Sequence, residues 1–145
     1  MKEVRHHDSN RLAHSLKVSY YSYKVSKILH LDYEQAACGG LLHDFFIERT
    51  VNYENPKDKF LLYTTKHPLL ALKNAEEHFD ITEKEADMIK CHMFPLDIRI
   101  PKYAESWVVN LVDTCVSTFE FSKKFGYQFS YLFNLYLILL FNTMK

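Results

Sequence analysis

Apolar residues recur at helical spacing in most of the chain, which predicts an all-helical fold. The first such segment runs from Arg11 to about Leu29, and residues of the types that cap helices, Asp8-Ser9-Asn10, precede it. Spacings of three and four residues place its apolar side chains on one face of a helix. These residues are Leu12, Leu16, Val18, Tyr21, Val25, Ile28 and Leu29.

The second predicted helix, from about Tyr33 to Leu42, is built from small residues. Its centre contains Ala36, Ala37, Gly39 and Gly40. Glycine inside a helix costs up to about 1 kcal/mol relative to alanine. We therefore expect a close approach of a neighbouring element to compensate for the two glycines.

Two further helices are predicted in the middle of the chain. The segment Ile47–Thr65 is polar and irregular and is predicted to be a mobile connection or a short helix. A third helix should begin at Pro68, with His67 at its N-terminal edge, and end near Phe79. Thr82-Glu-Lys-Glu85 has the pattern of a capping box and should begin a fourth helix, which Pro95 ends.

The C-terminal part predicts a fifth helix over Tyr103–Phe121 and a sixth over Gln128–Asn142. The apolar run Phe129–Phe141 is about 13 residues long, against the roughly 20 that a membrane-spanning helix needs. We therefore expect the segment 126–143 to pack internally or to form an oligomer interface, and not to cross a membrane. About six helices in a single compact domain, residues 1–145, are the expected architecture.

Composition excludes several classes of partner and compartment. Lysine plus arginine and aspartate plus glutamate each number 18, so no net charge favours nucleic acid or an anionic membrane. The three cysteines form no CxxC pair and lie among apolar residues, as reduced thiols do. The N-terminal segment lacks the apolar core of a signal peptide. A cytoplasmic protein is expected.

Several of the eight histidines, and two aspartates, interrupt apolar segments. His43-Asp44 follows Leu41-Leu42, and Asp113 follows Leu111-Val112. Each residue alone has an ordinary explanation, such as a surface histidine at position 14 or a helix C-terminal histidine at position 43. Because burying an unpaired carboxylate is costly, a shared metal ion explains these residues together.

The order of these residues resembles the HD-domain superfamily of metal-dependent phosphohydrolases. His14, His43-Asp44 and Asp113 lie in the segments RLAHSLKVSYYSYKVSKIL, AACGGLLHDFF and VVNLVDTCVS, and the resemblance covers about Arg11–Glu120. It implies a helical HD-type bundle in which these four residues hold one divalent metal ion. His67 and His92 match positions that supply a second ion in the dinuclear branch of the family, where Asp44 would bridge both ions.

The resemblance implies hydrolysis of a phosphoester or phosphoanhydride in a small, nucleotide-like substrate. Asp44, His67 and His92 would be the catalytic residues, and with one ion the two histidines would serve as general acids or phosphate contacts. Imidazole and carboxylate suit one or two ions of Fe, Mn, Co, Zn or Mg. Candidate phosphate-binding residues are Arg11, Lys17, Lys66, Arg99 and Lys102.

Departures from the family pattern narrow the substrate. Phe45-Phe46-Ile47-Glu48 replaces the Ile-Gly-Lys that follows the HD pair in many relatives. Neither a second histidine nor Gly-Tyr-Pro follows His92, so cleavage of cyclic dinucleotides is not expected. Only Glu48 represents the acidic pair of alarmone hydrolases, which disfavours guanosine polyphosphates. The alternative is a non-catalytic HD-fold module that binds metal or nucleotide, and either form could dimerise through its C-terminal helix.

Overall fold

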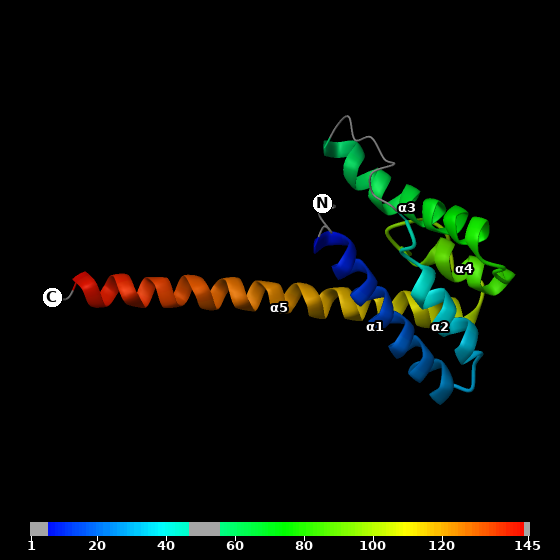
Figure 1. Cartoon of the computed structure of the whole chain (residues 1–145), viewed down its shortest axis with the longest axis horizontal. Coiled ribbons are helices and arrows are strands. Elements are labelled where there is room, and N and C mark those ends of the chain that lie inside the picture. Colours follow the sequence, from blue (N-terminus) through cyan, green and yellow to red (C-terminus); the bar gives the residue numbers. More distant parts are fainter. Residues whose placement is uncertain (1–5, 47–55, 144–145) are drawn as a thin grey trace, which may run out of the picture.

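The computed structural model describes residues 6–46 and 56–143, with side chains described for 11–46, 64–128 and 130–131. These residues contain no strand and form five helices, which confirms the all-helical prediction (Figure 1). The helices are α1 (His6–Ile28), α2 (Tyr33–Leu42), α3 (Pro56–His78), α4 (Glu83–Cys91) and α5 (Ala104–Thr143). Helix α2 lies centrally and contacts all four others.

Helix α1 buries three serines with Val18, and most of the apolar residues that were predicted to form its packed face are exposed. Its buried residues are Ser15, Val18, Ser22 and Ser26, whereas Leu12, Leu16 and Ile28 are more than half exposed. Serine side chains allow α1 and α2 to approach closely: a Cβ on Gly40 would lie 3.1 Å from Ser19 Cα. The start also differs, because α1 begins at His6 and includes Asp8–Asn10, which were predicted to precede it.

Helix α2 has the predicted bounds, and its other glycine, Gly39, lies against α4. A Cβ on Gly39 would collide with Met88 Sδ and would lie 2.9 Å from Met88 Cβ. The predicted close approach at the two glycines is thus confirmed. Met88 belongs to a core cluster that joins α1, α4 and α5. A second cluster joins the end of α2 to α3 and α4, through Leu42, Phe46, Ala71, Ala75 and Ile89.

Helix α3 is longer than predicted. It begins at Pro56, a residue that suits the first turn of a helix, and continues through Pro68. Because proline has no N–H to donate to the preceding turn, it was a reasonable but wrong choice for the start of this helix. His67 therefore lies inside α3. The rest of the predicted connection, residues 47–55, lies outside the described residues.

The fourth predicted helix is confirmed together with its capping box. Thr82 Oγ1 accepts a hydrogen bond from the Glu85 backbone N–H at 3.2 Å, and the Thr82 backbone N–H donates to Glu85 Oε2 at 2.8 Å. Helix α4 ends at Cys91, four residues before Pro95. This well-defined helix fixes the position of His92 at its C-cap.

The predicted fifth and sixth helices form one helix of 40 residues, α5. Gly126 does not end it, because one glycine costs about 1 kcal/mol and no proline follows. The C-terminal part runs on beyond the other helices (Figure 1), with Phe121, Phe125, Tyr127 and Tyr131 exposed. An oligomer interface here stays a prediction. Among the described helices, none combines the length and apolar character required to cross a membrane.

We predict that Gly39→Ala destabilises the protein and Gly126→Ala does not. The new methyl group at position 39 meets Met88, and such overpacking costs about 1–3 kcal/mol. At Gly126 a Cβ meets nothing within 4 Å, so alanine should stabilise the helix by up to about 1 kcal/mol. Chemical denaturation of both variants measures the difference, and equal stabilities would contradict the α2–α4 packing.

Candidate metal centre

All six predicted metal ligands meet in one place, although they come from five helices. They form two groups, His14, His43 and Asp113, and Asp44, His67 and His92. In each group, one potential ligand atom per residue lies within 4.8 Å of the others. The described chain thus supplies each group with two imidazoles and one carboxylate.

In the first group, two histidines converge on one oxygen of Asp113. His14 Nε2 lies 2.9 Å and His43 Nε2 3.6 Å from Asp113 Oδ1. His43 is fully buried, whereas His14 and Asp113 are partly exposed. This group therefore has a closed side, at His43, and an open side.

In the second group, two buried histidines face Asp44. His67 Nε2 lies 3.5 Å and His92 Nε2 3.8 Å from Asp44 Oδ1. The two Nε2 atoms lie only 2.9 Å apart. Nitrogens at this distance either share a proton or direct lone pairs to a common cation.

The carboxylate of Asp44 lies between the two groups. Its Oδ1 faces His67 and His92, while its Oδ2 lies 3.8 Å from His43 Nε2. One carboxylate therefore presents a different oxygen to each group. This is the geometry that a ligand shared between two ions requires.

His43 and His92 are oriented in the same way, by a hydrogen bond to a carbonyl in the last turn of the preceding helix. Each is the C-cap of its helix, where the last carbonyl groups lack helical partners. His43 Nδ1 donates to the Gly40 carbonyl at 2.8 Å, and His92 Nδ1 donates to the Ile89 carbonyl at 2.7 Å. Because Nδ1 donates to the carbonyl, Nε2 is the nitrogen that points into the site, where it can bind a metal ion once it carries no proton.

Glu120 orients His14 in a similar way and was not predicted from the sequence. His14 Nδ1 lies 3.0 Å from Glu120 Oε2, and Lys17 Nζ lies 2.6 Å from Glu120 Oε1. Carboxylates commonly hold the second nitrogen of a metal-binding histidine. A signal existed: Glu120 follows Asp113 by about two helical turns, on the same face of α5.

Burial and crowding keep His67 and His92 neutral. Burial and the neighbouring His92 lower the pKa of His67 to about 3. The pKa of His92 is lowered by its own burial and by His43. Neutral imidazole is the form that binds a metal ion.

Both carboxylates of the centre stay ionised. Burial alone would raise the pKa values of Asp44 and Asp113, but the surrounding histidines lower both. In return, Asp44 and Asp113 outweigh the effect of burial on His43 and raise its pKa to about 9. A divalent cation would compete with that proton for the two carboxylates.

The surroundings of one atom, His43 Nε2, indicate whether the residues fit a metal ion. His43 Nε2 is buried and has no hydrogen-bond partner among the described residues. Buried polar atoms without partners are rare, and an ion is one of their explanations. His43 Nε2 faces both carboxylates, and imidazole with carboxylate is a donor set for first-row divalent metals. The residues fit such an ion.

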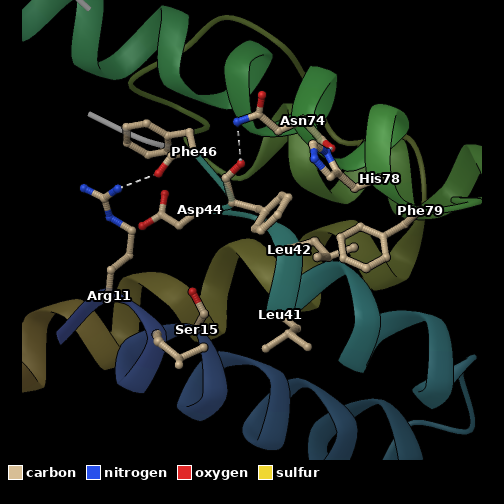
Figure 2. Close-up of a pocket in the computed structure, with 11 residues that line it drawn as sticks. Arg11, Ser15, Leu41, Leu42, Asp44, Phe46, Asn74, His78 and Phe79 are labelled. Carbon is tan, nitrogen blue, oxygen red and sulfur yellow. Dashed lines mark hydrogen bonds between the residues drawn. The ribbon is translucent and has the colours of Figure 1, made fainter. Parts of the chain in front are cut away.

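Two cavities adjoin the centre. One, of about 340 Å³, has five of the six candidate ligands in its wall, together with the Met93–Leu96 turn and the hydroxyl-bearing residues Thr114, Ser117 and Thr118 of α5. The other, of about 510 Å³, lies between α1, the end of α2 and α3 (Figure 2). Asp44 lines both.

No protein-family model, curated protein or solved structure matches this chain. Function must therefore follow from the residues of the site itself. The two groups of histidine and aspartate around Asp44 are the strongest basis that the described chain offers.

Of the five predicted phosphate-binding residues, Arg11 lines the larger cavity. Lys17 pairs with Glu120, and Arg99 Nη1 lies 2.7 Å from Asp97 Oδ2. Lys66 and Lys102 are exposed, and none of these four belongs to the described walls of either cavity. Their contact with phosphate stays a prediction, and Ile47-Glu48 lies outside the described residues.

Cys91, next to His92, is a core thiol. It is buried, and its Sγ lies 3.6 Å from Asp87 Oδ1. It belongs to neither histidine–aspartate group. Burial and Asp87 raise the pKa of the thiol to about 11, so the thiol is protonated at neutral pH.

We expect Glu120→Ala to weaken divalent metal binding by about 10–100-fold, the usual cost of losing such an orienting partner. Without Glu120, the Nδ1 side of the His14 ring loses its described partner, and the ring is held only from its Nε2 side by Asp113. Calorimetric titration with Mn²⁺ measures the change. Glu76→Ala, which removes an exposed carboxylate of α3, is the control, and equal affinities for the two variants would contradict this role.

Proposed function

We propose that this protein is a metal-dependent phosphohydrolase of the HD type, acting on a small phosphorylated molecule. One observation carries the proposal: the Asp44 carboxylate presents separate oxygens to two groups, each with two histidines. The order of these residues along the chain, with His43-Asp44 adjacent, adds the resemblance to the HD-domain superfamily.

The centre supplies the chemistry that phosphoester hydrolysis needs. A divalent ion held here would bring the pKa of a coordinated water toward about 7 and polarise a phosphoryl oxygen. Asp44 and Asp113 balance the cationic charge, and His14, with its partner Glu120, lies on the exposed side. With one ion in the first group, neutral His67 and His92 remain to contact phosphate or transfer a proton.

The alternative is an HD-fold module that binds metal or nucleotide without turnover. Selection for binding alone does not require two complete ligand groups opening onto a cavity. Here His14, Asp44, His67, His92 and Asp113 all line the 340 Å³ cavity. The complete set favours the enzyme.

Asp44→Ala should remove most bound metal, because it takes a ligand oxygen from both groups. Purified full-length protein should contain at least one divalent ion per chain by elemental analysis, and the variant should contain far less. Asp80→Ala, at an exposed aspartate just after α3, is the matched control. An Asp44→Ala protein with full metal content would show that the ligand assignment is wrong.

Hydrolytic activity is tested with the same preparations. With Fe, Mn, Co or Mg added, wild-type protein should release inorganic phosphate from members of a phosphoester panel. Asp44→Ala should lose activity by about 100–1,000-fold, because the ion lost with Asp44 would have stabilised the transition-state charge and losing one such group costs that order. Stable metal binding without turnover of any substrate would favour the non-catalytic module.

A further inference from the structure

The 510 Å³ cavity beside the metal centre has a largely apolar wall. Its apolar lining comes from α1, from the end of α2 and the residues after it, and from the end of α3, and consists of Leu12, Leu41, Leu42, Phe45, Phe46 and Phe79. Figure 2 shows these elements enclosing the space. Cavities of about 300–1,000 Å³ with apolar walls and few polar groups are typical of small-molecule sites.

Two residues, Asp44 and Arg11, place this cavity next to the candidate metal centre. Asp44 lines both cavities. Arg11 lines the larger cavity, and Figure 2 shows its guanidinium and the Asp44 side chain at the same end of the space. A molecule with its phosphate at the metal centre would therefore have a cation and an apolar chamber beside it.

Three polar side chains of the wall each donate a hydrogen bond to a backbone carbonyl of the protein. Asn74 Nδ2 donates to the Phe45 carbonyl at 3.1 Å, and His78 Nδ1 donates to the Asn74 carbonyl at 2.9 Å. Arg11 Nη1 donates to the Phe46 carbonyl at 2.8 Å and its guanidinium stacks on the Phe46 ring. A nucleobase or a polyol buried here would lose hydrogen bonds to water and regain few.

We propose that this cavity binds the apolar, ring-sized organic group of a phosphoester whose phosphate lies at the metal centre. The inference rests on the proposed function and narrows its substrate to phosphates of hydrophobic alcohols or phenols. Nucleotides and sugar phosphates, the more polar candidates, fit this wall less well because their hydrogen-bonding groups find few partners.

The test compares three phosphates with metal-loaded, full-length protein: 1-naphthyl phosphate, glycerol 2-phosphate and AMP. We expect a KM for 1-naphthyl phosphate at least about tenfold below those of the other two, the order of discrimination that apolar pockets give. Equal KM values, or a lower KM for AMP, would overturn the inference while leaving the hydrolase in place.

Two variants locate the preference in the cavity. Phe79→Ala removes half-exposed aromatic wall, and Leu12→Asn changes an exposed wall residue with little risk to folding. Both should reduce the ratio of the KM for AMP to the KM for 1-naphthyl phosphate toward one. Phe125→Ala, at an exposed phenylalanine of α5 outside both cavity walls, should leave the ratio unchanged. A ratio that none of the three variants alters would overturn the assignment to this cavity.

A second measurement separates this inference from the proposed function. 1-Naphthol carries no phosphate, so its fluorescence titration into metal-free protein reports on the cavity alone. Binding that Phe79→Ala and Leu12→Asn weaken, in a protein that hydrolyses nothing, would support the cavity and reject the hydrolase. A protein that hydrolyses glycerol 2-phosphate but binds no naphthol would support the hydrolase and reject the cavity inference.

Discussion

A nearly buried carboxylate, Asp44, imposes the strongest constraint on this fold. An isolated ionised carboxylate is very costly to bury, yet the pKa of Asp44 is lowered, because His43, His67 and His92 surround it. These histidines come from the end of α2, from α3 and from the end of α4. The ends of α2 and α4 and the middle of α3 must therefore lie next to Asp44, which constrains how these three helices are arranged.

Small residues make this arrangement possible. The pair His43-Asp44 reaches the centre because α2 lies deep among its neighbours, with Gly40 against α1 and Gly39 against Met88 of α4. Larger side chains at either glycine would push α2 outward and carry His43 with it. Each glycine costs a short helix about 1 kcal/mol, and the close contacts with α1 and α4 that the two glycines permit hold His43-Asp44 at the candidate metal centre.

The sequence was informative where a local rule determines the structure. The bounds of α2 and the capping box at Thr82 were predicted in this way and are seen. The meeting of six histidines and aspartates was expected from the family resemblance and is also seen. The sequence was less informative where tertiary packing decides. The buried face of α1 is mostly serine because α2 approaches so closely, and a hydrophobicity pattern cannot show this. Glu120 was missed because a glutamate near the end of the predicted fifth helix, Tyr103–Phe121, ordinarily faces solvent.

Under the proposed function, the residues after the metal-binding pair determine which substrate is accepted. Phe45 and Phe46 line the apolar cavity directly after Asp44, where many HD proteins have Ile-Gly-Lys. Arg11 of α1 is the cation at this point of the wall, bonded to the Phe46 carbonyl and stacked on the Phe46 ring. The Arg11 guanidinium is thus held against the aromatic wall of the cavity. Phe45 and Phe46, which depart from the family pattern, therefore join the apolar chamber to the charged centre.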